Sequence, residues 1–180
     1  MLIVMCGLPA TGKTTLSRAL ARRTGAVHLR IDTVEQAIVR SGLARHPVGP
    51  AGYAVGYALA EEHLRQGLWV VAESVNPLAV TRDAWRDTGL RAGAVVAEVE
   101  VVCSDEVEHR RRVASRSVDI PGLPLPDWEA VRSRDYQPWH RDRIVLDTAG
   151  RGVSDCLAEL LFALDLDVHD QAARASKASG

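Results

Sequence analysis

The sequence predicts an α/β fold, a three-layer α/β/α sandwich built around a five-stranded parallel sheet. Segments with the pattern of a strand and of a helix alternate five times along the chain, and parallel strands need such crossover helices between them. Residues 68–73 are apolar except for the last, which is typical of a strand that is buried on both faces. Apolar residues at i, i+3, i+4, i+7, i+8 and i+11 from Val153 predict an amphipathic helix that packs on this sheet.

Length and composition favour one globular domain. The chain has 180 residues, a net charge of −1 and 47% hydrophobic residues, so we expect a single domain over 1–167 and a disordered tail at 168–180. The balanced charge makes nucleic acid an unlikely partner. No apolar run approaches the ~20 residues that a membrane-spanning helix needs. The start lacks a signal-peptide pattern and the three cysteines lack metal-ligand spacing. We therefore expect a cytoplasmic protein, either a monomer or a homodimer.

The individual elements are predicted from hydrophobic periodicity and from the residues that start and stop them. Gly25 and Gly67 are expected to end helices, and Thr33 and Ser104 are expected to cap the helices that follow them. Strands are expected at residues 2–6, 27–30, 68–73, 94–103 and 143–147. Helices are expected at residues 13–24, 34–41, 53–66, 78–88, 105–116, 128–134 and 153–164. Loops are expected at the glycine- and proline-rich segments 42–52 and 117–127.

The most specific motif is GLPATGKT, residues 7–14, which follows the first strand directly and opens the first helix. It matches G-x-x-x-x-G-K-[ST], in which glycines let successive backbone N–H groups turn inward around a phosphate chain and a helix N-terminus adds its free donors. The pattern places the ammonium of Lys13 near the β- and γ-phosphates and the hydroxyl of Thr14 on Mg²⁺. We therefore expect a nucleoside triphosphate to be bound by Gly7, Leu8, Pro9, Ala10, Thr11, Gly12, Lys13, Thr14 and Thr15.

Polar residues also follow the other predicted strands, at the edge of a parallel sheet where ligands bind. Asp32 could take the proton of an acceptor hydroxyl, or it could only cap the next helix. Arg30, two residues earlier, could contact the acceptor or a phosphate. Glu73 could bind Mg²⁺ or position the acceptor, although a lone acidic residue at a strand end is common. Asn76 could hydrogen-bond the acceptor or serve only as a turn residue before proline.

Two arginines precede the segment 117–127. Arg112 and Arg116 are four residues apart and would share one face of a helix, with His109 beside them. Arginines on a mobile cover can stabilise the charge on a phosphoryl group in transfer. We therefore expect a lid at about 112–127; the alternative is an ordinary solvated helix face.

These segments together resemble the small P-loop kinases of the zeta-toxin, chloramphenicol phosphotransferase and gluconate kinase group. The resemblance rests on GLPATGKTT, the short strand before Asp32, the strand ending at Glu73, and the segments VVCSDEVEHRRRVASR and IVLDTAG, and it covers roughly residues 1–149. It implies the strand order 2-3-1-4-5 and a kinase that uses ATP and Mg²⁺ to phosphorylate a hydroxyl of a small metabolite or antibiotic. It also implies Asp32 as the base, Arg116 near the transferring phosphate, Arg112 against the adenine, and Asp147 and Thr148 along the nucleotide base.

The sequence departs from that group on the acceptor side. Thr33, Val34 and Glu35 stand where polynucleotide-kinase relatives carry an arginine, which weakens a role on nucleic-acid ends. Residues 45–57 match no relative of known substrate, so the acceptor stays open, as does the choice between ATP and GTP. Two alternatives remain: a nucleotide-dependent switch module that binds a protein partner, and an RNA-end or nucleotide-sugar kinase.

Overall fold

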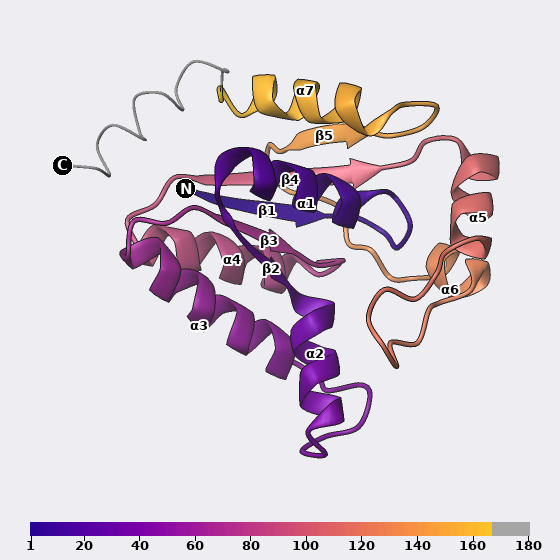
Figure 1. The fold of residues 1–180 in the computed structure, drawn as a ribbon, viewed down its shortest axis with the longest axis horizontal. Helices are drawn as coiled ribbons and strands as arrows, with labels where there is room; N and C mark the ends of the chain where they lie inside the picture. The colour runs from indigo at the N-terminus through magenta and orange to yellow at the C-terminus, as the bar shows by residue number, and fades with distance from the viewer. Residues whose placement is uncertain (167–180) are drawn as a thin grey trace.

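Five parallel strands form one sheet in the order β2-β3-β1-β4-β5 in the computed structural model, which describes residues 1–166 (Figure 1). The strands are β1 (Leu2–Cys6), β2 (Val27–Arg30), β3 (Val70–Glu73), β4 (Val96–Val102) and β5 (Ile144–Asp147). The helices are α1 (Lys13–Thr24), α2 (Ile31–Arg40), α3 (Ala51–Arg65), α4 (Ala79–Arg91), α5 (Glu106–Ala114), α6 (Trp128–Arg132) and α7 (Val153–Ala163). The predicted three-layer sandwich and the strand order implied by the resemblance are both confirmed.

The central strand β1 supplies both faces of the core. Its five residues are all buried, and successive side chains of a strand point to opposite faces of the sheet. Ile3 and Met5 pack under α1 and α7, whereas Leu2, Val4 and Cys6 pack against α2, α3 and α4. This alternation explains why an uninterrupted apolar run belongs to a strand covered by helices on both sides.

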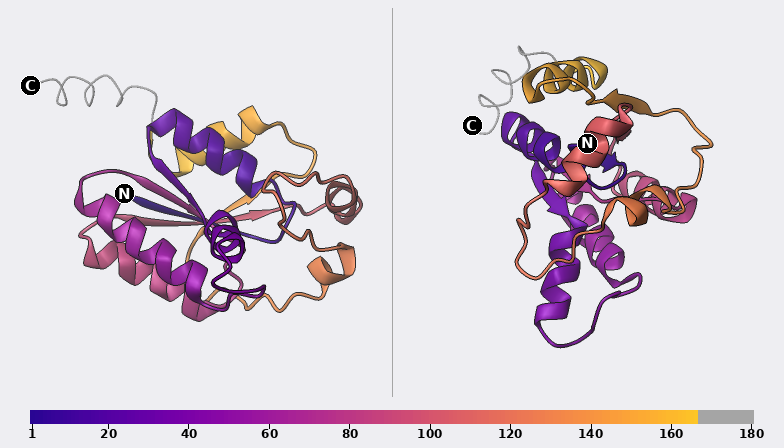
Figure 2. Two further views of the ribbon diagram at one scale, coloured as in Figure 1. Left: turned by 60° about the horizontal axis from the view of Figure 1, so that its bottom comes forward. Right: turned by 90° about the vertical axis from the view of Figure 1, so that its right-hand side faces the viewer.

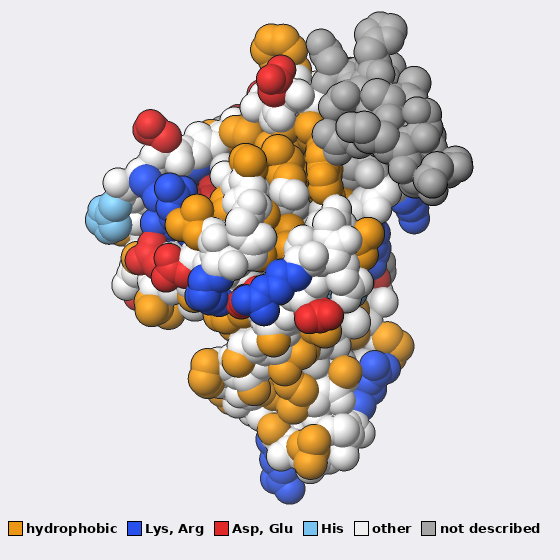
Figure 3. All heavy atoms as spheres, turned by 90° about the vertical axis from the view of Figure 1, so that its left-hand side faces the viewer, with side chains coloured by type: hydrophobic (Ala, Val, Ile, Leu, Met, Phe, Trp, Pro, Cys, Tyr) orange, Lys and Arg blue, Asp and Glu red, His pale blue; other side chains and the backbone are white. Residues whose placement is uncertain are grey.

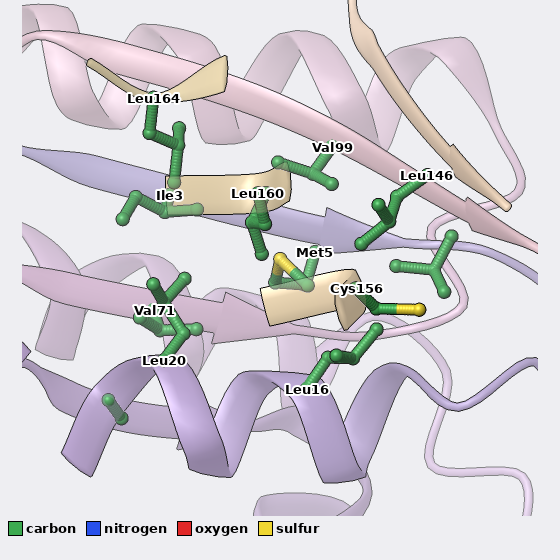
Figure 4. Packing of buried hydrophobic residues seen from close by; sticks show 12 residues of the cluster. Ile3, Met5, Leu16, Leu20, Val71, Val99, Leu146, Cys156, Leu160 and Leu164 are labelled. Atoms are coloured by element: carbon green, nitrogen blue, oxygen red, sulfur yellow. The ribbon is translucent and has the colours of Figure 1, made fainter. Parts of the chain in front are cut away.

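Each face of the sheet carries its own apolar cluster. Figure 4 shows one of them, in which Leu16 and Leu20 of α1 and Cys156 and Leu160 of α7 meet the buried side chains of the strands. On the other face, Trp85 of α4 is fully buried in the second cluster. Figure 2 shows α5 and α6 set apart from these layers, beyond the carboxyl ends of the strands.

The strand register brings the candidate site residues to one edge of the sheet. Arg30 at the end of β2 pairs with Glu73 at the end of β3, and Glu73 pairs with Met5 of β1. On the far side, Val102 pairs with Asp147. The turns that leave these strands therefore start at the same edge of the sheet as the loop that joins β1 to α1.

Two predicted helix starts are corrected. Helix α2 begins at Ile31 rather than after Thr33, because the Ile31 side chain is buried in the core, and this places Asp32 in the first turn, where the helix dipole favours a carboxylate. Helix α5 is capped by Asp105, whose carboxylate accepts a hydrogen bond from the Glu108 N–H at 3.0 Å. Ser104 does not cap it, since its N–H donates to Asp147 instead.

Helix α5 is also shorter than predicted. It ends at Ala114, so Arg116 lies in the irregular chain that follows and does not share a helical face with Arg112. The other elements differ from their predicted bounds by a few residues at most. The predicted tail at 168–180 lies outside the described residues.

No helix among residues 1–166 is long and apolar enough to cross a membrane. Figure 3 shows the end of the molecule opposite the carboxyl ends of the strands, where Lys and Arg side chains lie close to Asp and Glu side chains. Charge of one sign does not dominate this face.

Candidate active site

A cavity of about 740 Å³ opens at the carboxyl ends of the strands. The loop Gly7–Thr14, the start of α2, the chain after β3 and the segment that follows α5 form its walls. Figure 2 shows these segments gathered around one end of the sheet. Of the residues predicted for the site, those that line the cavity are Pro9, Ala10, Gly12, Lys13, Thr14, Thr15, Asp32, Glu73, Arg112, Arg116 and Thr148.

Two glycines of the loop Gly7–Thr14 adopt backbone conformations that residues with a Cβ rarely adopt. Gly7 has a φ of +133°, and a Cβ there would lie 2.1 Å from the Val101 carbonyl oxygen. Gly12 precedes α1 with a φ of +96°. Glycine tolerates such φ values at little cost, so the loop can curl tightly between β1 and α1. The curl leaves the first N–H groups of α1 free of side-chain caps and beside the cavity.

Lys13 is buried inside this loop. Its Nζ donates a hydrogen bond to the Leu8 carbonyl at 3.0 Å. Burial lowers the pKa of Lys13, and the charges of Glu73 and Asp32 oppose that effect. A cation held beside a cradle of backbone amides fits the β- and γ-phosphates of a nucleotide, so the residues present match the predicted ligand.

Glu73 links the loop to β2. One carboxylate oxygen accepts a hydrogen bond from the Thr14 hydroxyl, and the other lies 2.8 Å from Nε2 of His28. Burial acts to raise the pKa of Glu73, but the hydrogen bond from His28, the charge of Lys13 and the hydrogen bond from Thr14 outweigh it and lower the pKa overall. The carboxylate is therefore ionised at neutral pH.

Thr14 and Glu73 supply the kind of oxygen ligand that Mg²⁺ prefers. Within the described part of the chain no three His, Cys, Asp or Glu side chains form a metal cluster. A Mg²⁺ ion that uses one or two protein oxygens and completes its shell with phosphates and water fits this donor set.

Asp32 faces the cavity from the first turn of α2. Its side chain is about one-third exposed, and Oδ2 accepts a long hydrogen bond of 3.3 Å from Arg30. Arg30 is not part of the cavity wall, because its guanidinium is buried, and its predicted contact with the acceptor or a phosphate stays a prediction. It is engaged by the Asp119 carboxylate at 2.6 Å and lies 3.8 Å from Glu73. Arg30 therefore contacts the carboxylates of Asp32 and Glu73 without lining the cavity itself.

Asn76, predicted to contact the acceptor or to serve only as a turn residue, lies away from the cavity. It is fully buried and does not line the cavity. Its Nδ2 donates to Sγ of Cys6 at 3.2 Å, and its backbone N–H donates to the Tyr53 hydroxyl at 3.2 Å. The side chain turns toward β1 because Asn76 adopts a left-handed conformation with a φ of 53°, which Asn tolerates better than most residues.

Arg112 and Arg116 both line the cavity, Arg112 from helix α5 and Arg116 from the irregular chain that follows it. Arg112 donates to the hydroxyl and the carbonyl of Thr148, both at 2.8 Å. The Thr148 hydroxyl also lies 2.8 Å from the Thr11 carbonyl, so Arg112 is tied through Thr148 to the loop Gly7–Thr14. The Arg116 side chain forms no hydrogen bond with residues 1–166, and its charge acts to lower the pKa of Lys13.

Asp147 does not line the cavity. Its carboxylate accepts hydrogen bonds from the N–H groups of Ser104 and Ala149, each at 3.0 Å. Partial burial acts to raise the pKa of Asp147, and these hydrogen bonds more than offset it. Asp147 thus fixes the turn after β5, and its neighbour Thr148 faces the cavity; the predicted contact of Asp147 with a nucleotide base stays a prediction.

The sequence did not point to several residues that support the site. His28 holds Glu73, and its spacing of two from Arg30 on one strand was the only available signal. His109, expected beside the lid arginines, is buried and its Nε2 lies 2.8 Å from the Pro9 carbonyl. Glu35, Tyr53 and Ser74 line the cavity, and no motif marks them.

Comparisons with known proteins show what the chain is similar to in sequence and in fold. A family model described as "AAA domain" matches residues 2–134. No curated protein matches the chain significantly.

Solved structures of similar fold include three named kinases. A sugar kinase from Janibacter is 18% identical with a TM-score of 0.69, and the alignment covers 92% of this chain and 94% of that one. A gluconokinase from Sinorhizobium meliloti is 19% identical with a TM-score of 0.59, covering 93% and 97%. The APS kinase of Mycobacterium tuberculosis, solved with AMPPNP and APS, is 17% identical with a TM-score of 0.63, covering 91% and 96%. At these identities the likeness shows a shared fold.

Proposed function

The chain belongs to the AAA domain family, and from that membership and the site we propose that it is a phosphotransferase that moves the γ-phosphate of ATP to a hydroxyl of a small molecule. One observation carries the proposal: the buried ammonium of Lys13 lies within electrostatic reach of Glu73, Asp32 and Arg116, and all four residues line one cavity. A protein that only binds phosphate needs positively charged side chains such as Lys13 and Arg116, but no carboxylate. The carboxylate of Asp32 beside them supplies what transfer to an alcohol requires, a group that can accept the hydroxyl proton.

The loop Gly7–Thr14 and Lys13 would hold the triphosphate, with Arg112 and Thr148 at the nucleotide end. Thr14 and Glu73 would hold Mg²⁺, which would offset the negative charge of the phosphates when bound. Asp32 would bind the acceptor hydroxyl and take its proton as the oxygen forms a bond to the γ-phosphorus. The bond from that phosphorus to the bridging oxygen breaks, and ADP leaves with the electron pair. Arg116 and Lys13 would stabilise the charge that spreads over the transferring group.

We further propose that residues 1–167 act as one domain in which the segment of about 112–127 serves as a lid. Leu123, Pro124, Leu125 and Pro126 form one cavity wall and could exclude water, which would limit wasteful hydrolysis. The gluconokinase and APS kinase of similar fold are kinases, and one was solved with AMPPNP, which supports a nucleotide-dependent reaction here.

The test is phosphate transfer itself. Purified protein with ATP and Mg²⁺ is screened against hydroxylated metabolites, nucleosides and aminoglycoside-type antibiotics, and ADP release and phosphorylated product are measured together. Lys13→Ala should abolish both, along with the thermal stabilisation that ATP gives by mass action. The protein could instead bind ATP and form no product with any acceptor. If its Asp32→Asn variant also bound ATP equally well, these results would favour a switch module.

A further inference from the structure

The cavity continues past Asp32 into a region that the nucleotide does not need. There it runs between α2, the start of α3, the chain after β3 and the segment 123–126. We call this region the acceptor end. Its polar groups are Asp32, Glu35, Tyr53 and Ser74, with His46 and Arg134 also on the wall.

Glu35 is a carboxylate without a protein partner at this end. It lies three residues after Asp32, so both side chains project from one face of α2. Among residues 1–166, no side chain or backbone group forms a hydrogen bond or an ion pair with the carboxylate of Glu35, whose surroundings act on it only through burial and the charge of Asp32. Burial raises the pKa of Glu35, and the nearby charge of Asp32 raises it further. A half-buried carboxylate beside a second one is costly unless a cation neutralises it.

Ser74 provides a second observation, separate from Glu35, that indicates a ligand at the acceptor end. Its side chain is 95% buried, since only 5% of the residue is exposed, and it forms part of the cavity wall. Burial raises the pKa of Tyr53 and an interaction with the Ser74 hydroxyl offsets this only partly, yet the distance and angle of that contact are not those of a hydrogen bond, and no other described residue forms one with the Ser74 hydroxyl. A buried hydroxyl without a partner costs about 1–3 kcal/mol, and a bound molecule would remove that cost.

Most of the positive groups that line the cavity are assigned to the nucleotide. Lys13, Arg112, Arg116 and Arg151 line the cavity, and on the proposed function we assign them to the nucleotide. Behind Asp32, the guanidinium of Arg30 is held by Asp119.

Two positive or titratable groups remain near the acceptor end. Arg134 is exposed, and Nε2 of His46, also an exposed residue, lies 2.8 Å from the Gln36 side-chain oxygen. An anionic acceptor would therefore meet Asp32 and Glu35 first. Apart from Thr81, whose hydroxyl donates to the Leu78 carbonyl, the remaining wall is apolar and consists of Ile31, Val75, Pro77, Leu78, Leu123, Pro124, Leu125 and Pro126.

From these observations we propose that the phosphate acceptor is an amino alcohol, a hydroxyl compound such as an amino sugar or an aminocyclitol whose protonated amine is bound by Glu35 and whose polar edge is bound by Ser74. The less polar face of the molecule packs against the apolar wall. This inference rests on the proposed function, because Asp32 must receive the hydroxyl that Glu35 and Ser74 present to it. Glu35 is then a determinant of specificity, whereas Asp32 is the catalytic residue.

The experiment compares matched probes that differ mainly in charge. D-glucosamine is paired with D-glucose and D-gluconate, and 2-deoxystreptamine is paired with myo-inositol. Binding is measured by calorimetry with AMPPNP and Mg²⁺ present, and transfer is measured with ATP. We expect at least one amine to bind roughly tenfold more tightly than its neutral partner, as one partly buried ion pair can provide. Glu35→Gln should remove this preference and leave the affinity for the neutral partner unchanged.

Glu106→Gln is the matched control, because it makes the same substitution at an exposed glutamate outside the cavity. It should keep the preference for the amine. A second variant, Gly52→Ala, moves Glu35 without removing its charge. A Cβ at Gly52 would lie 2.3 Å from Cγ of Glu35, and that flexible side chain must shift. Alanine favours a helix over glycine, so this variant should fold and still lose several-fold of the amine preference.

The outcomes separate the two proposals. An amine that binds through Glu35 without being phosphorylated supports an amine-binding site at Glu35 but contradicts both the kinase and the role of that amine as acceptor. Transfer only to neutral or anionic compounds supports the kinase and overturns the acceptor class. Equal affinity for amines and their neutral partners, no binding of either amine, or an amine preference that survives Glu35→Gln, also overturns it.

Discussion

The Asp119 carboxylate accepts a hydrogen bond of 2.6 Å from the buried guanidinium of Arg30, which lies 89 residues earlier in the chain. The same oxygen accepts a second hydrogen bond of 2.9 Å from Arg18 of α1. Asp119 lies in the proposed lid, whereas Arg30 ends β2 and contacts Asp32 and Glu73. One carboxylate therefore joins the lid to the two acidic side chains at the centre of the site.

Asp119→Asn should loosen the lid. The amide keeps the shape of the side chain but loses the charge that pairs with Arg30 and Arg18, so we expect the ratio of ATP hydrolysis to phosphate transfer to rise several-fold. ADP release and product formation are measured in parallel. Asp135→Asn, at an exposed aspartate outside the cavity, is the control. An unchanged ratio would show that this contact does not hold the lid.

Asp32→Asn should separate a kinase from a switch module. Loss of a base costs about 10² or more in rate, while the phosphate-binding groups stay in place. We therefore expect transfer to fall by that factor and the thermal stabilisation by ATP to remain. Steady-state kinetics and thermal unfolding with ATP measure the two effects. Normal transfer by this variant would rule out Asp32 as the base.

Arg116→Ala should lower kcat more than it raises KM for ATP. A guanidinium that stabilises charge developing in transfer acts mainly on the transition state, and such arginines can be worth roughly 10³–10⁵ in rate. Arg110→Ala is the control, since Arg110 is exposed on α5 and does not line the cavity. Proportional changes in both parameters, or none, would mean that Arg116 is a solvated arginine.

Glu73 should make stability depend on pH in the acid range. The pKa of Glu73 in the folded protein lies below its ordinary value of 4.5, so the unfolded chain takes up this proton first as pH falls. The stabilisation is complete above that ordinary value and is lost as pH falls through the lower pKa of the folded state. Urea unfolding of wild type and Glu73→Gln between pH 3 and pH 7 measures it. We expect the difference between them to shrink toward pH 3, and a difference independent of pH would contradict the assignment.

Arg82 should be essential for stability although it does not line the cavity. Its guanidinium is 1% exposed and donates hydrogen bonds to the carbonyls of Asn76, Pro77, Gln137 and Pro138. It also lies over the ring of Trp139, 4.3 Å from its centroid.

Arg82→Met should therefore leave several buried carbonyls unpaired and lower the free energy of unfolding by about 3 kcal/mol or more. Urea denaturation measures the change. Arg86→Met, at an exposed arginine of the same helix, should change it by less than ~0.5 kcal/mol.

Local patterns in the sequence predicted the sandwich, the strands and the loop Gly7–Thr14. Each depends on neighbours in the chain: an apolar run makes β1 a buried strand, and Gly7 and Gly12 permit a tight turn before Lys13. Asp32 and Arg116 could also be predicted as site residues from the sequence. Asp32 comes shortly after a predicted strand that ends at the ligand-binding edge of the sheet, and Arg116 comes at the end of a predicted helix that follows another such strand.

Only the tertiary structure decided what the remaining side chains do. Arg30 and Asn76 have the polarity of ligand-binding residues, yet packing buries them against Asp119 and Cys6. Conversely, nothing near Glu35 in the sequence shows that its carboxylate lacks a partner. Hydrogen bonds between strands and across the lid join residues far apart in the chain, and whether a polar group is left without a partner depends on every segment that packs around it.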